Sequence, residues 1–130
     1  DVGGFVGSVM GKLGNVIENS YSSGNVIASG LDNIGGFLGH IEDDAEIKNS
    51  FSVAQRVEGN ISGYFAGHIS ALAVLSGIYY YDGAICPGCD ITGTNISSLS
   101  YFYNSANAPM SVWDFSTIWT PQASTYPVLR

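Results

Sequence analysis

Two cysteines and two histidines are the side chains whose types and spacing most suggest chemistry. Cys86 and Cys89 bracket the turn dipeptide Pro87-Gly88, so their thiols can close a small ring. We predict a structural disulfide, because a redox-active pair would need a helix N-terminus and no helical pattern follows. A zinc ion would need about four ligands, and His40 and His68 are the only further candidates of matching type. We predict that the chain binds neither a metal nor a cofactor.

Acidic side chains offer two further possibilities. Residues 42–46, Glu-Asp-Asp-Ala-Glu, form the densest acidic run, but they lack the D-x-D-x-D-G spacing of a calcium loop, which favours a solvated turn over a calcium site. Asp82, Asp90 and Asp114 could converge as paired carboxylates for sugar hydrolysis. No nucleophile motif accompanies either histidine. We therefore predict that the chain is not an enzyme.

Two kinds of residue suggest contact with sugars. Asn60 and Asn95 each begin an Asn-x-Ser sequon for glycosylation. The stretch 99–110 contains Tyr101, Phe102 and Tyr103 among polar residues, and such aromatic rings bind sugars by stacking. The same rings could instead be the core of a C-terminal cap, which we favour.

Composition excludes several classes of partner. The chain has 130 residues, of which 12% are charged, about half the share of an average soluble domain. Eleven acidic against four basic residues give a net charge of −7, so the basic surface of a nucleic-acid-binding protein is missing. The longest apolar runs, such as residues 69–75, fall short of the roughly 20 residues of a membrane-spanning helix. The length suits one domain.

Internal repeats organise the chain. Residues 3–7, Gly-Gly-Phe-Val-Gly, return at residues 35–39 and more loosely at residues 63–67. A second block, Ile-Glu-Asn-Ser-Tyr-Ser at residues 17–22, returns at residues 47–52 and in degenerate form at residues 75–80. Two blocks in register predict three tandem repeats, at about residues 2–30, 34–58 and 61–85, followed by a cysteine loop and capping segment at residues 86–130. Because Asp1 begins in mid-pattern, we expect one structural unit cut from a longer chain.

The second block alternates with the period of a β-strand. Ile17, Asn19 and Tyr21 share the face that we expect to point inward, and the serines between them should face water. Short apolar tails at residues 26–28 and at Val57 could supply another strand in each repeat. Short strands at a period of about 30 residues predict an all-β fold, a β-solenoid of about three coils whose equivalent strands pair in parallel. An antiparallel β-sandwich is the alternative.

An asparagine recurs at the same position of the second block. Asn19 and Asn49 would lie one above the other in stacked coils, where their side chains could form an amide ladder. A lone inward-facing asparagine would be costly, so stacking explains its recurrence. Gly77 occupies the third position, where the ladder should stop.

These repeats resemble a known family. Gly-Gly-Phe-Val/Leu-Gly followed by Ile-x-Asn-Ser-Tyr/Phe-Ser is similar to the GLUG repeat of large secreted and surface-attached bacterial and archaeal proteins, including adhesin-like chains. Residues 113–119 and 126–130 also resemble the segment that closes such arrays, over about residues 2–85 and 112–130 in all. Its bulky side chains would cap the exposed end of the last coil: Trp113, Phe115, Trp119 and Tyr126. The resemblance implies no catalytic residues.

These observations predict a non-catalytic structural or adhesive module that works outside the cell or on its surface. Its expected partners are other coils of the parent chain or neighbouring subunits, with surface glycans and cell-surface proteins as further candidates. One alternative is a subunit of an extracellular filament or coat that assembles through an open N-terminal edge. Another is a carbohydrate-binding domain. We expect the open edge at residues 1–7 to promote self-association.

Overall fold

The chain has an all-β fold. The computed structural model describes residues 1–11, 14–108 and 110–130. Besides strands, these residues form two short 3₁₀ helices, η1 (Leu99–Tyr103) and η2 (Met110–Val112). Within the described residues, neither helix approaches the length or apolar character needed to cross a membrane.

Each repeat supplies one layer of strands. The first layer contains β1 (Val2–Gly3), β2 (Val6–Val9), β3 (Val16–Glu18), β4 (Tyr21–Ser22) and β5 (Val26–Ile27). The second contains β6 (Ile34–Gly35), β7 (Leu38–Ile41), β8 (Glu46–Ser52) and β9 (Val57–Glu58). The third contains β10 (Ser62–Gly63), β11 (Ala66–Ile69) and β12 (Val74–Tyr81). The remaining strands are β13 (Thr94–Ile96), β14 (Trp119–Thr120) and β15 (Val128–Leu129).

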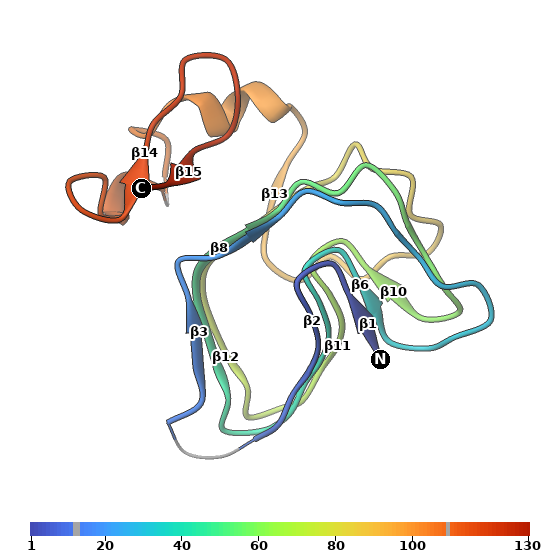
Figure 1. The fold of residues 1–130 in the computed structure, drawn as a ribbon. Coiled ribbons are helices and arrows are strands. Elements are labelled where there is room, and N and C mark those ends of the chain that lie inside the picture. Colours follow the sequence, from blue (N-terminus) through green and yellow to red (C-terminus); the bar gives the residue numbers. More distant parts are fainter. Residues whose placement is uncertain (12–13, 109) are drawn as a thin grey trace.

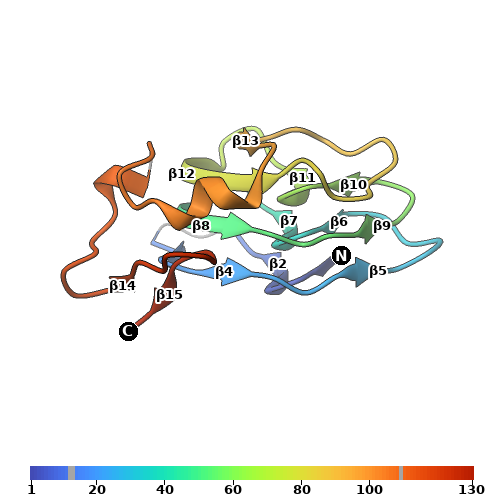
Figure 2. The ribbon, with the colours of Figure 1, turned by 90° about the horizontal axis from the view of Figure 1, so that it is seen from above.

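Equivalent strands of successive layers pair in parallel. The sheets run β1–β6–β10, β2–β7–β11 and β3–β8–β12–β13, and β4 and β5 pair with β8 and β9. Val2, Ile34 and Ser62 lie side by side, which is the register that the repeats predict. Figure 2 shows the layers one above another. The antiparallel sandwich does not form, because among the described strand pairs only β14–β15 is antiparallel.

Within residues 85–96, only residues 90–96 add part of a further layer to the third one. Asp90 pairs with Gly63 in an isolated bridge, and β13 pairs with Tyr79–Tyr81 at the end of β12. Ile85 pairs with Arg56 of the second layer and so completes the third. Within the described chain, β11 and the first half of β12 have no strand beside them on this side. At the opposite end, the whole first layer is an edge.

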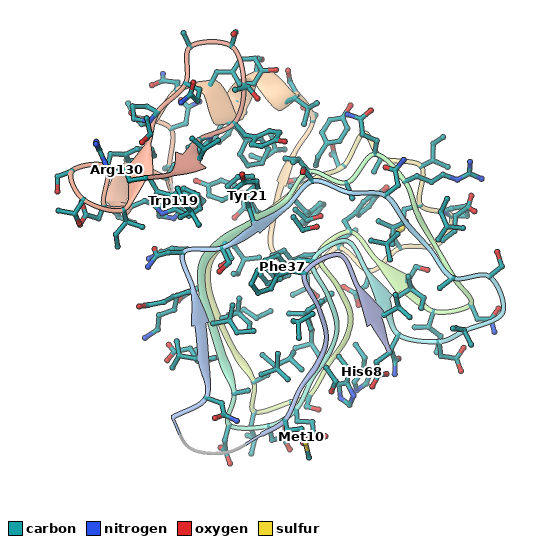
Figure 3. The ribbon with its side chains drawn as sticks, viewed as in Figure 1. Met10, Tyr21, Phe37, His68, Trp119 and Arg130 are labelled. Atoms are coloured by element: carbon teal, nitrogen blue, oxygen red, sulfur yellow. A yellow bond between two sulfur atoms is a disulfide. The ribbon has the colours of Figure 1, made fainter. Side chains whose placement is uncertain are left out.

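Three apolar clusters hold the layers together, and the smallest of them, around Ile34 and Val57, joins β5, β6 and β9. The first fills the space between the β2–β7–β11 and β3–β8–β12 sheets, where Phe37 points inward (Figure 3). Its centre is a column of rings, with Phe5 stacked on Phe37 at 4.9 Å and Phe37 on Phe65 at 4.8 Å between centroids. The second cluster lies outside the stack, between β4, β8 and β12 and the chain after residue 98 (Figure 1).

Candidate functional site

The predicted disulfide is present. Cys86 and Cys89 are bonded across the Pro87-Gly88 turn, with their Cα atoms 5.5 Å apart and the Cys89 N–H donating to the Cys86 carbonyl at 3.3 Å. The bridge lies between Ile85, which pairs with Arg56 of the second layer, and Asp90, which pairs with Gly63 of the third. In this bonded form both sulfurs serve the architecture of that loop.

The two histidines lie together, as their equivalent repeat positions predict. The His40 and His68 rings meet edge to face with centroids 4.8 Å apart. The Nδ1 atom of His40 is 3.7 Å from Oδ2 of Asp1, whose Oδ1 accepts a hydrogen bond from the Asn33 amide at 2.7 Å. Within the described residues, no three His, Cys, Asp or Glu side chains are grouped to hold a metal ion.

The acidic run joins three layers. The Glu42 carboxylate accepts a hydrogen bond from the Gly11 N–H of the first layer at 3.0 Å. Asp43 accepts one from the Leu72 N–H of the third layer at 2.9 Å, and Glu46 pairs with Lys48 at 2.9 Å. Asp43 and Asp44 form an exposed turn, as predicted, and Glu42 and Asp43 also accept hydrogen bonds from backbone donors of the neighbouring layers.

The three aspartates considered for sugar hydrolysis have separate local partners. Asp82 accepts from the Asn95 amide at 3.3 Å, and Asp90 accepts from the Thr92 N–H at 2.9 Å. Asp114 accepts hydrogen bonds from Ser116 and Thr117, which hold the pKa of its carboxyl well below the usual range. No hydrogen bond among the described residues joins any two of these three carboxylates.

One aromatic side chain from each layer forms a row on the outer flank of the stack. Tyr21, Phe51 and Tyr79 are in register, and this aromatic row is covered by the flank segment, residues 99–130. Trp119 lies 6.2 Å from Tyr21 and 5.9 Å from Phe51 between ring centroids (Figure 3). Trp113 reaches Phe51 at 5.8 Å and Tyr79 at 5.7 Å. The contacts therefore span all three layers.

The predicted cap is thus displaced from its expected place. The proposed cap residues all belong to the cluster on the aromatic row: Trp113, Phe115, Trp119 and Tyr126. They cover the side of the three layers, whereas the end of the third layer is partly covered by residues 85–96. Phe102 is buried, and Tyr101 and Tyr103 pack against the same cluster, so this region is core as favoured. Asn60 and Asn95, the two sequon residues, are exposed.

The aromatic row faces outward because, in each layer, the residue two positions before the aromatic one has a left-handed backbone conformation. Asn19, Asn49 and Gly77 have φ values of 53°, 46° and 62°. Asparagine and glycine are the residues that most readily adopt this left-handed conformation. Figure 1 shows the chain turning where β3 ends. The turn interrupts the alternation of faces, so Ile17 belongs to the interior cluster and Tyr21 to the outer one.

Two expectations about the second block are corrected by this turn. The serines do not face water: Ser50 is 0% exposed and Ser52 is 1% exposed. Asn19 accepts a hydrogen bond from the Trp119 indole at 3.4 Å, and no described hydrogen bond joins its amide to that of Asn49. The conformation of the turn explains why asparagine recurs and why glycine can replace it.

Substitutions at Asn49 distinguish two explanations for this asparagine, its left-handed backbone conformation and a side-chain amide ladder. We expect Asn49→Gly to change the free energy of unfolding by less than about 0.5 kcal/mol, whereas Asn49→Ala should lower it by about 1–2 kcal/mol, because only glycine adopts a positive φ without strain. Urea unfolding of both variants measures the difference. Equal losses in the two variants would show that the side-chain amide matters, as in a ladder.

Comparison with known proteins gives no family for the chain. No protein-family model, no curated protein and no solved structure matches it.

The first layer exposes side chains that the other layers bury. Phe5 is 51% exposed, whereas Phe37 and Phe65 in the same column are 0% exposed. Met10, Val16 and Ile27 are also exposed on the first layer. Charge is sparse here, and the strands β1 to β5 have partners on one side only. This open edge presents the same kind of surface that joins the layers inside the molecule.

Proposed function

We propose that the chain is a non-catalytic structural module of a secreted or cell-surface repeat protein, folded as a short β-solenoid of about three coils of the GLUG type. The exposed Phe5 at the head of the Phe37–Phe65 column carries this proposal. A large apolar ring beside unpaired strand edges fits a surface that packs against a further coil. The partner is then another coil of the parent chain or a neighbouring subunit.

The extracellular setting is supported by the disulfide and the sparse charge. Disulfides persist in oxidising environments outside the cell, and Cys86 and Cys89 form one across a four-residue loop. Both sequon asparagines are exposed, so they would be open to modification where the host glycosylates asparagine. An adhesive role for the parent protein follows from the resemblance of the repeats.

Two observations favour this proposal over a filament subunit and a carbohydrate-binding domain. A filament would need the open edge of one copy to stack in register on the far end of the next copy. Residues 85–96 already lie beside β10 and the end of β12, where β1 and β4 of an incoming copy would have to pair. A sugar-binding surface between Tyr101 and Trp113 would need accessible rings, but Phe102 and Trp113 are buried and Tyr101 and Tyr103 are half-buried.

Adding a coil tests the proposed module. We expect a copy of residues 34–60 fused directly before Asp1 to fold as an extra layer, because Asp1 then takes the position that Ile61 holds after the second repeat. Burying Phe5 should raise the free energy of unfolding by about 2 kcal/mol. The Tyr21 amide should become protected from hydrogen exchange, since the equivalent Phe51 N–H donates to the Ser20 carbonyl.

A fusion of the same 27 residues in scrambled order is the matched control. It adds equal length and composition but no strand register, so it should leave the stability and the exchange of the Tyr21 amide unchanged. If the native copy behaved like the scrambled one, the open edge would not be a coil-packing surface and the proposed function would fail.

A further inference from the structure

A depression of about 950 Å³ lies at the end of the stack opposite the open edge. It exists because residues 85–96 cover only part of the third layer, and residues 88–92 form its wall. Its floor contains the strand β11 and the half-buried side chains of Ile69, Ala73 and Leu75. His68, labelled in Figure 3, lies at its side.

The backbone of β11 presents to the depression the kind of hydrogen-bonding groups through which the lower layers pair with one another. At this point of the stack the Glu42 N–H donates to the Val9 carbonyl, and the Ser70 N–H donates to the Ile41 carbonyl, both at 3.0 Å. The next carbonyl in this column is that of Ile69, which by the same geometry points to the open side. Ser62 also lines the depression; it is 5% exposed, and its hydroxyl has no hydrogen-bond partner.

The sequences of the stacked strands below the depression indicate which kind of strand would fit into it. β2, β7 and β11 read Val-Gly-Ser-Val, Leu-Gly-His-Ile and Ala-Gly-His-Ile. The final aliphatic residue fills the interior, and the next one in the column would lie over Ile69 and Leu75. The glycine is required by close approach, since a Cβ on Gly67 would overlap the backbone of Asn33 and Ile34 one layer below. A fourth glycine would lie against Ile61 and Ser62, which line the depression.

We propose that this depression binds an extended peptide strand of the pattern aliphatic-Gly-polar-aliphatic, which adds in parallel to β11 as a fourth strand of the β2–β7–β11 sheet. Strand addition gives affinity through main-chain hydrogen bonds and specificity through alternate side chains. The occupant is a single strand beside β11, because residues 90–96 already lie beside β10 and the end of β12 in that layer. The site goes beyond the structural role proposed above and lies at the opposite end of the molecule.

A synthetic peptide with the sequence of residues 36–42, Gly-Phe-Leu-Gly-His-Ile-Glu, tests the site by NMR titration of the full chain. We expect chemical-shift changes at residues 61–62 and 67–70. The control peptide carries valine at its second glycine, and it should bind about tenfold more weakly or less, because the valine side chain would overlap Ile61 and Ser62.

Two variants of the protein locate the binding. Ala71 is exposed and lines the depression, so Ala71→Trp should weaken binding by about tenfold or more without affecting folding. Ala106→Trp, at an exposed position in the flank segment, should bind like the unmodified chain. Shifts confined to residues 5–27, equal binding of the two peptides, or no binding at millimolar peptide would each overturn the proposal. These results concern the third layer, so they are independent of the fusion at the first layer.

Discussion

Phe51→Ala is expected to lower the free energy of unfolding by about 3–5 kcal/mol, among the largest losses for a single side chain of this fold. Phe51 is 0% exposed and is the middle member of the aromatic row. Since a domain of this size is stable by only about 5–15 kcal/mol, the variant should lose a third or more of its stability.

The effect is large because Phe51 contacts aromatic rings on every side. It stacks on Tyr21 of the layer below at 5.1 Å between centroids and meets Phe102 of the flank segment at the same distance. Trp113 and Trp119 lie at 5.8 and 5.9 Å. Truncation leaves a cavity beneath all of these rings, and the rings cannot close it without leaving the other two members of the row.

The chain carries its own probe for this result. Its two tryptophans, Trp113 and Trp119, both belong to the flank segment and are buried against the aromatic row. Urea unfolding followed by tryptophan emission therefore reports on docking of the segment, while far-UV circular dichroism reports on the layers. Val112→Ala is the control, because Val112 is 76% exposed, and it should change the stability by less than about 0.5 kcal/mol. A loss below about 1 kcal/mol for Phe51→Ala would show that the flank segment does not depend on the row.

Much of the fold follows from the spacing of the repeats. The pairings of Gly3 with Gly35 and of Ile17 with Ile47 are the alignments of the two sequence blocks. Because stacked parallel strands place identical positions side by side, a repeated sequence defines its own register. Even the degenerate third repeat obeys it, since Gly63 pairs with Gly35.

The faces of the second block could not be read from alternation alone. A single left-handed residue moves every later side chain to the opposite face, and the strand pattern of Ile-x-Asn-Ser-Tyr-Ser gives no sign of it. The exchange of Asn49 for Gly77 was the available signal, because asparagine and glycine share a preference for positive φ. Tyr21, which simple alternation predicts to point inward, therefore points outward, where the flank segment packs against it.

The contacts made by the acidic run and the depression beside β11 had no signal in the sequence. Glu42 and Asp43 bind donors 31 and 29 residues away, through a turn whose shape depends on all three layers. The depression depends on where residues 85–96 stop covering the third layer, and these residues lie outside the repeated pattern. Repeat spacing predicts contacts between equivalent positions only, so it does not predict features that form where unlike segments pack together.

Gly36→Ala is expected to produce the second large loss, about 3 kcal/mol in the free energy of unfolding. A Cβ on Gly36 would overlap the Tyr64 carbonyl oxygen of the third layer and the Ser52 hydroxyl beside it. The backbone cannot move aside, because the Gly36 N–H donates to the Gly63 carbonyl at 3.2 Å within the same contact.

The third layer carries larger side chains at this position, where Asp90 and Ile91 lie beside it. The equivalent of Gly36 is Tyr64, the equivalent of Ser52 is Tyr80, and their rings stack at 5.2 Å with planes 3° apart. Burial raises the pKa of Tyr80, and the nearby Asp82 raises it further. The Gly36 and Ser52 pair of the second layer is thus replaced by the Tyr64 and Tyr80 pair in the third.

Gly24→Ala provides the matched control for Gly36→Ala. Gly24 is exposed, has an ordinary φ and would place its Cβ within 4 Å of no other heavy atom, so alanine there should be neutral or stabilise by about 0.4–1 kcal/mol. Urea unfolding of both variants measures the difference. If Gly36→Ala were as mild as Gly24→Ala, glycine at that position would serve only the turn after β6. A difference of about 3 kcal/mol would instead show that close contact between layers makes glycine recur at this position in the first two repeats.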